Sequence, residues 1–126
     1  MALVVGKLDV VVGNAGVLGE LRPLAHYTPE LWSDTFAINV HANWRLIRTL
    51  DPLLRRSESG RAIFVTSGAA TKAMAYWAAY CASKAALDQM VRAWAAELAE
   101  TSVRANLLSP GATRTTMRAN AFPGED

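Results

Sequence analysis

Tyr80 and Lys84 are the residues whose types and spacing could do chemistry. They lie four positions apart in an alanine-rich stretch, so in a helix they share one face, about one turn apart. A lysine ammonium beside a phenol favours the phenolate, which predicts a tyrosine pKa below its usual value of about 10. Such a tyrosine could exchange a proton with a substrate oxygen near neutral pH. The same spacing is common in ordinary surface pairs, and alone it favours that reading.

Two further polar residues could complete a site. Ser67 directly follows an apolar run, where a hydroxyl at the carboxyl end of a strand could hydrogen-bond a substrate carbonyl or hydroxyl. Serine is also frequent there as a plain turn or helix cap. Asn39 falls on the apolar stripe of a predicted helix, which is unusual for a polar residue. A satisfied buried amide that bridges helix and strand would explain it equally well.

The elements that must position these residues follow from the hydrophobic pattern. Two long helical stretches separate three short apolar runs, which predict buried parallel strands. The first helix begins at Thr28-Pro29, with a hydroxyl N-cap and proline in the first turn. We expect Pro52 to kink or break it and Ser59-Gly60 to end it. The second helix covers about Tyr76 to Glu100 and has a core-facing apolar stripe. The three predicted strands are Leu8–Val12, Ala62–Thr66 and Val103–Leu108.

Strands that alternate with helices predict an α/β fold, in which right-handed crossovers build a parallel sheet covered by helices. Ligands of such sheets bind beyond the carboxyl ends of the strands. All three predicted strands end in small or polar residues, which are Gly13-Asn14-Ala15-Gly16, Ser67-Gly68 and Ser109-Pro110-Gly111. This convergence predicts a functional site at one edge of the sheet.

The bulk properties exclude several classes of protein. The 126 residues suit one domain, and 52% apolar with 19% charged residues is typical of a soluble globular chain. The basic residues are scattered, which argues against a nucleic-acid or membrane patch. The single cysteine, Cys81, allows no intrachain disulfide and argues against a structural zinc site. No apolar run approaches membrane-spanning length, so we expect a cytoplasmic protein without a metal.

Taken together, five motifs resemble those of the short-chain dehydrogenase/reductase family, over a match from about Lys7 to Arg118. The family carries Asn-Asn-Ala-Gly after its fourth strand, a helical Asn-Val, a serine that ends the fifth strand, Tyr-x-x-x-Lys, and Pro-Gly-x-x-x-Thr after the sixth strand. The matching residues stand in the same order in this chain. They are Gly13-Asn14-Ala15-Gly16, Asn39-Val40, Val65-Thr66-Ser67, Tyr80 with Lys84, and Pro110-Gly111 with Thr115.

The resemblance implies a role for each catalytic position. Tyr80 would be the general acid/base, and Lys84 would lower its pKa and bind the nicotinamide ribose. Ser67 would orient and polarise the substrate carbonyl. Asn39 would hold a water that continues the proton relay to Lys84.

The resemblance also implies the ligands. The cofactor would be NAD or NADP, and the substrate a small-molecule alcohol or carbonyl compound, with no nucleic-acid or membrane partner. Besides Tyr80 and Lys84, the cofactor-binding residues would be Asn14, Ala15 and Gly16 beside the adenosine ribose, and Pro110, Gly111 and Thr115 near the nicotinamide and pyrophosphate.

Two departures from the family pattern shape the expectations. Gly13 replaces the first asparagine of its motif, and the family's glycine-rich phosphate turn is not found in the chain. We therefore expect residues 1–126 to form a partial Rossmann-like, doubly wound domain that is poorly active alone. The strand Leu8–Val12, central in the family, would become an edge.

Two other functions stay open. A non-catalytic protein could use the same fold to bind a nucleotide or partner, although Ser67, Tyr80 and Lys84 together disfavour this. A structural fragment could instead associate through its helices, in keeping with the homodimers and homotetramers that the resemblance implies.

Overall fold

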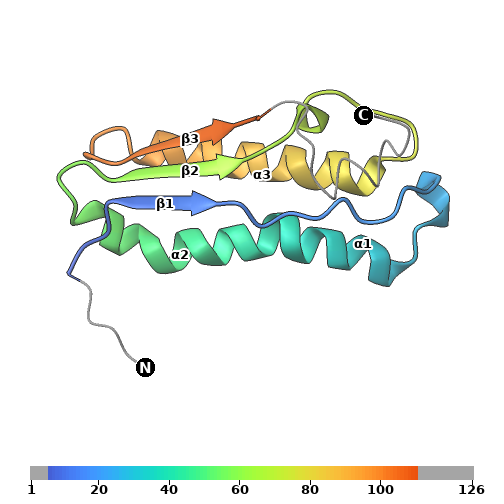
Figure 1. Ribbon diagram of the computed structural model, residues 1–126, viewed down its shortest axis with the longest axis horizontal. Helices are drawn as coiled ribbons and strands as arrows, with labels where there is room; N and C mark the ends of the chain where they lie inside the picture. The colour runs from blue at the N-terminus through green and yellow to red at the C-terminus, as the bar shows by residue number, and fades with distance from the viewer. Residues whose placement is uncertain (1–5, 111–126) are drawn as a thin grey trace.

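A three-stranded parallel sheet forms the centre of the computed structural model, which describes residues 6–110 (Figure 1). The strands are β1 (Val10–Gly13), β2 (Arg61–Val65) and β3 (Arg104–Leu108), paired in the order β1-β2-β3. The predicted strands are thus confirmed to within two residues at each end. Within the described sheet β1 lies at one edge, as expected.

Two long helical segments connect the strands. The first joins α1 (Pro29–Phe36), a π-helical turn η2 (Ala37–His41) and α2 (Ala42–Arg55), and the second is α3 (Ala78–Glu97). Short 3₁₀ turns occur at η1 (Leu24–His26) and η3 (Gly68–Ala70). No helix within residues 6–110 combines the length and apolar character needed to cross a bilayer.

The first helical segment begins where the sequence predicted and ends earlier. Thr28 is the N-cap, and its side chain accepts a hydrogen bond of 3.2 Å from the Leu31 N–H. Of the expected kink or break at Pro52, the break is wrong, because α2 continues past Pro52 to Arg55, and the helix ends there rather than at Ser59-Gly60. A proline this close to the C-terminus of a helix removes one hydrogen bond and leaves little helix beyond it to disrupt.

The second helix is shorter than predicted at both ends. It begins at Ala78 rather than Tyr76, because Tyr76 has a φ of 72°, which is left-handed backbone and not helical. It ends at Glu97, and Leu98 is the C-cap.

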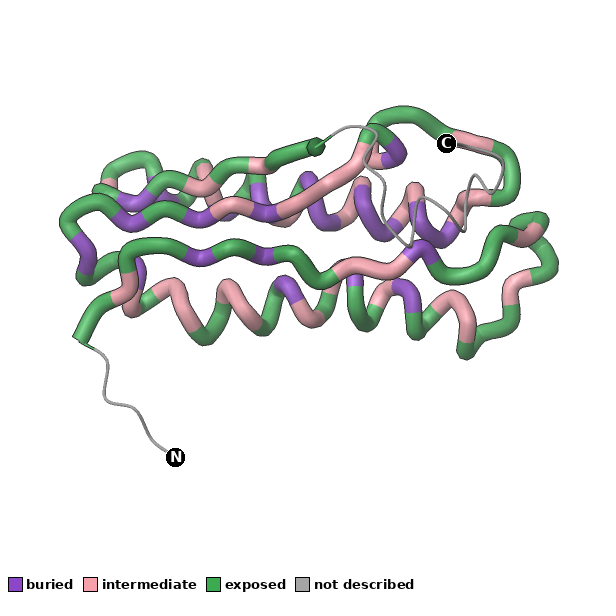
Figure 2. The backbone as a smooth tube through the Cα atoms, in the orientation of Figure 1, coloured by how far each residue is buried: buried purple, intermediate pink, exposed green. Residues whose placement is uncertain are grey.

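Both helical segments pack on the same face of the sheet, as two right-handed crossovers in one direction require. Val11, Ala62 and Phe64 point to this face and share one core cluster with helix residues. The helix residues of this cluster include Leu54 of α2 and Leu87, Val91 and Trp94 of α3. The opposite face, which we call the open face, leaves Val10 58% and Val12 57% exposed, and in Figure 2 buried and exposed positions alternate along β1.

Candidate active site

Ser67 lies at the carboxyl end of β2 and has two partners. Its Oγ accepts a hydrogen bond of 3.2 Å from the Ala69 N–H, so it is the N-cap of η3. Its side chain also lies close enough to Tyr80 for a hydrogen-bonding effect that lowers the pKa of that phenol. Because the hydroxyl accepts from Ala69, its own hydrogen remains available for the phenol oxygen. Ser67 is therefore both the N-cap of η3 and the serine that the sequence predicted for the site.

Tyr80 is 6% exposed, in the first turn of α3. Its burial raises the pKa of Tyr80 above the ordinary value of 10.0, against the lowering effect of the Ser67 hydrogen bond and with a smaller raising effect from Cys81. The predicted lowering of this pKa by Lys84 is therefore wrong in direction. The lysine Nζ lies over the tyrosine ring, 5.8 Å from its centroid, and burial of the phenol dominates. The Tyr80 phenol is therefore in its neutral form at physiological pH.

Lys84 is also buried, with 4% of its surface exposed. Its Nζ donates a hydrogen bond of 3.4 Å to the backbone oxygen of Val65, the acceptor it meets within residues 6–110. Burial lowers the pKa of Lys84, and the charge of Asp88 acts in the opposite direction. An ammonium group has three N–H donors, so one weak bond leaves donors for a ligand.

Asn39 lies in the π-helical turn η2 and is fully buried. Its Oδ1 accepts from the Val17 N–H at 2.8 Å, and its Nδ2 donates to the Val17 oxygen at 3.0 Å and to Ser83 Oγ at 2.9 Å. The bridging-amide reading is thus what the structure shows, with both amide hydrogens used. A water held by Asn39 stays a prediction. It would have to share Oδ1 with the Val17 N–H or the backbone oxygen with Asn43 Nδ2, which donates to it at 2.9 Å.

Two glycines, one at the end of β1 and one after it, lie in close contact with other side chains. A Cβ on Gly16 would lie 3.1 Å from Lys84 Nζ and 3.6 Å from Asn39 Oδ1, so this residue borders the site directly. A Cβ on Gly13 would lie 2.3 Å from a ring carbon of Phe64. The Phe64 ring thus occupies the space of the side chain that the family motif would place there.

The remaining predicted cofactor residues are only partly described. Asn14 and Ala15 are exposed beside Gly16, and Pro110 is exposed after β3. Gly111 and Thr115 lie outside the described residues.

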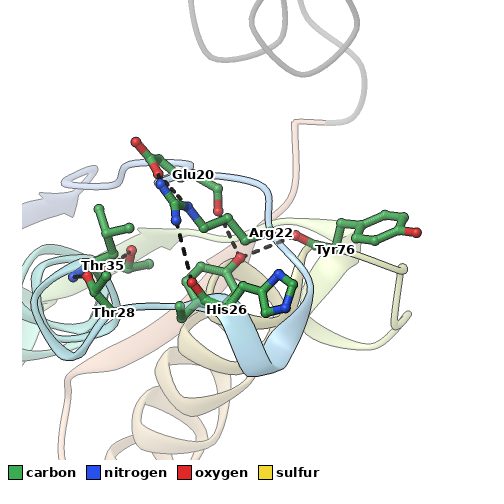
Figure 3. Close-up of polar contacts among 8 residues, drawn as sticks. Glu20, Arg22, His26, Thr28, Thr35 and Tyr76 are labelled. Carbon is green, nitrogen blue, oxygen red and sulfur yellow. Dashed lines mark hydrogen bonds and ion pairs between the residues drawn. The ribbon is translucent and has the colours of Figure 1, made fainter.

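No pattern in the sequence marks the strained residue that lies four positions before Tyr80. Tyr76 adopts a φ of 72° although it is not glycine, and it is 61% exposed. Figure 3 shows its backbone oxygen beside the loop that carries Glu20 and Arg22. That oxygen accepts from the Arg22 N–H at 3.0 Å and lies 3.2 Å from the Tyr27 hydroxyl. These contacts hold the loop between Ser67 and Tyr80 in its strained form.

A shallow cavity of about 420 Å³ lies elsewhere, over η1 and the start of α1. None of its lining residues is a predicted site residue; they are Leu24, Tyr27, Thr28, Pro29, Trp32 and Ser33. The chemistry-bearing groups gather instead at the carboxyl end of β2. Within residues 6–110, no three His, Cys, Asp or Glu side chains come together in a way that could hold a metal ion.

Comparison with known proteins places this arrangement in context. A curated relative, the uncharacterised oxidoreductase YciK of Escherichia coli K12, is 42% identical over 95% of this chain and 47% of its own length. A 2,3-dihydro-2,3-dihydroxybenzoate dehydrogenase of the same organism is 35% identical over 95% of this chain and 48% of its own. This chain therefore spans about half the length of the curated relatives it matches.

Solved structures agree with the sequence matches. A short chain dehydrogenase from Salmonella enterica serovar Typhi superposes with a TM-score of 0.93 at 42% identity, covering 97% of this chain and 50% of the other. A short chain dehydrogenase from Escherichia coli CFT073, complexed with NADPH, gives 0.91 at 41% identity, with the same coverage of 97% and 50%. The family model for short chain dehydrogenases matches residues 2–126. The chain belongs to the short-chain dehydrogenase family.

Proposed function

We propose that this chain carries the proton-transfer site of an NAD(P)-dependent oxidoreductase that interconverts an alcohol and a ketone. The observation that carries the proposal is the meeting of Ser67, Tyr80 and Lys84 at the carboxyl end of β2, with Tyr80 close to Ser67 and Lys84 over its ring. Two buried titratable groups and a serine hydroxyl at a strand end are a suitable set for acid/base chemistry.

Because burial raises the pKa of Tyr80, its phenol carries the proton that the reductive direction of the reaction would use. A neutral phenol can donate its proton to a carbonyl oxygen as negative charge develops there. The Ser67 hydroxyl beside the phenol would turn its one hydrogen toward the same oxygen and hold it in place. The E. coli protein solved with NADPH supports a nicotinamide cofactor, which when bound supplies the hydride.

The residues around Lys84 fit the ribose end of such a cofactor. The absence of a side chain at Gly16 leaves space beside Lys84 Nζ that a Cβ, at 3.1 Å from this atom, would fill. The ammonium has donors left after its bond to Val65, which suits ribose hydroxyls as acceptors. Asn14 and Ala15 remain the proposed neighbours of the adenosine ribose, together with Pro110, Gly111 and Thr115 near the nicotinamide and pyrophosphate.

The test is oxidation of NADPH and NADH by the 126-residue chain with a panel of ketones. We expect weak turnover that Tyr80→Phe lowers by about 10²- to 10⁴-fold, the usual contribution of a general acid. Tyr76→Phe, which removes the hydroxyl of a side chain that is 61% exposed and keeps the backbone of the loop, is the matched control and should retain activity. Equal turnover in Tyr80→Phe and wild type would contradict the proposal.

The alternative is a binding protein without turnover. The Asn39 amide favours it, because both of its hydrogens are used in bonds within the chain and none is left to donate to a proton relay. Binding of NADPH measured by its fluorescence, without oxidation by any ketone, would support this alternative.

Self-association is proposed through the two long helical segments. Ile38 is 38% and Trp44 47% exposed along the first of them, and the Arg48 guanidinium lies 5.8 Å from the Trp44 ring centroid. A homodimer or homotetramer in the cytoplasm is the expected form, and a monomer mass by light scattering at micromolar concentration would contradict the assembly.

A further inference from the structure

Three consecutive residues at the end of β2 contact three residues on one face of α3. Val65 accepts through its backbone oxygen from Lys84, and Ser67 lies within hydrogen-bonding reach of Tyr80. Between them, the Thr66 hydroxyl donates to the Asp88 carboxylate. Tyr80 and Lys84 already have proposed roles, whereas Asp88 has none.

Asp88 lies four residues after Lys84, so the two side chains share a helix face. They are 5% and 4% exposed, which makes both nearly inaccessible to water. They do not form a direct ion pair, because the ion pairs within residues 6–110 are Lys7–Asp9, Arg22–Glu20 and Arg55–Asp51. The carboxylate therefore acts on the ammonium through space, in a poorly screened interior.

A buried ammonium needs compensation for its lost hydration, or it gives up its proton. The bond to the Val65 oxygen is long, at 3.4 Å, and the Tyr80 ring offers only its face at 5.8 Å from the centroid. Toward the segment after β1 and toward η2, the residues near the Lys84 ammonium are Gly16 and Asn39, and neither of them is charged. Asp88 is the acidic group that acts on Lys84, and it opposes the lowering of the Lys84 pKa by burial.

We propose that Asp88, held in orientation by Thr66, is a positioning residue that keeps Lys84 protonated in the site. The inference rests on the proposed function for the use made of that charge, since a neutral lysine could not attract the phenolate left after proton transfer and would have one N–H donor fewer for a cofactor. The effect of Asp88 on the protonation of Lys84 concerns this chain alone, and it can be measured without cofactor or substrate.

The chain has three lysines, Lys7, Lys72 and Lys84, which makes the titration simple to resolve. The experiment follows the ¹³Cε shifts of labelled lysine against pH in the 126-residue chain, with Lys84 assigned from Lys84→Arg. In Asp88→Asn, which keeps an oxygen for the Thr66 hydroxyl but loses the charge, the Lys84 midpoint should shift to lower pH. The exposed Lys7 and Lys72 should not move.

Two further variants separate charge from packing. Thr66→Val removes the hydrogen bond but keeps the carboxylate, so it should lower the stability with a smaller shift of the Lys84 midpoint. Asp51→Asn is the matched control, because Asp51 also accepts a side-chain bond, from Trp94 Nε1 at 2.8 Å, and lies on a different helix. It should leave the Lys84 midpoint unchanged.

If Asp88→Asn does not fold, the double variant Thr66→Val with Asp88→Leu replaces both bonded groups by apolar ones, which is often nearly neutral, and the same downward shift is expected. An unmoved or raised Lys84 midpoint in either variant overturns the inference. Turnover of ketones tests the proposed function separately. A shifted Lys84 midpoint without turnover would support the role of Asp88 and contradict only the proposed oxidoreductase function.

Discussion

Asn39 donates a hydrogen bond of 2.9 Å from Nδ2 to Ser83 Oγ, and this bond joins the π-helical turn of the first helical segment to α3 across 44 residues. The same amide also pairs with both backbone groups of Val17. One buried side chain therefore ties together the segment after β1 and the two helices that carry the candidate site.

Asn39→Ala should lower the free energy of unfolding by about 2–4 kcal/mol, because it leaves several buried polar groups unpaired at ~1–3 kcal/mol each. Urea denaturation measures the change. Asn43→Ala is the comparison: this asparagine is similarly buried and its Nδ2 donates to the backbone oxygens of Ala15 and Asn39, but its Oδ1 has no hydrogen-bond partner within the described chain. A greater loss of unfolding free energy in Asn43→Ala than in Asn39→Ala would show that the Asn39 bonds are not the main link between these segments.

Gly13→Ala should destabilise the chain by about 1–3 kcal/mol, the usual cost of overpacking, because its Cβ would meet the buried Phe64 ring. Replacing the ring by a smaller side chain in Phe64→Leu should recover part of that loss in the double variant. Denaturant midpoints of the wild type, the two single variants and the double variant give the interaction energy. Gly68→Ala is the matched control, since a Cβ there meets no atom within 4 Å. Additive losses for Gly13→Ala and Phe64→Leu would contradict the contact.

Tyr76→Gly should unfold at a higher denaturant concentration than Tyr76→Ala. A left-handed conformation costs a residue with a Cβ about 1–2 kcal/mol and costs glycine little. Both variants remove the same exposed ring, so their difference isolates the backbone strain at φ 72°. Equal stability of the two would mean that the loop relaxes out of the left-handed region.

Tyr80→Phe should change how stability depends on alkaline pH. Because burial raises the pKa of Tyr80 in the folded chain, the unfolded chain releases this proton first as the pH passes about 10. The folded state then holds more protons, so the wild type loses stability as the pH rises further. Phenylalanine has no proton to lose, and thermal unfolding across this range should show a smaller alkaline loss. An identical loss in both proteins would contradict the raised pKa.

The strands and the strand-end turns could be read from the sequence because short apolar runs and small residues report directly on burial and turns. The π-helical turn could not, because it depends on bonds from Asn39 to residues 22 positions before and 44 after it. The helix start at Ala78 was missed since nothing local marks Tyr76 as left-handed. The predicted direction of the Tyr80 pKa shift was wrong for a related reason. The spacing shows that Lys84 is near, but it does not show how deeply the phenol is buried.

The open face of the sheet has a practical consequence for anyone who handles this chain. Val10 and Val12 expose β-branched apolar side chains where a solvated strand would usually place polar ones, and Leu108 at the end of β3 is 51% exposed. Sulfate and phosphate strengthen apolar association because they are excluded from protein surfaces. Precipitation by such salts will begin at this valine-rich surface, so low concentrations of less strongly excluded salts are the better storage buffers.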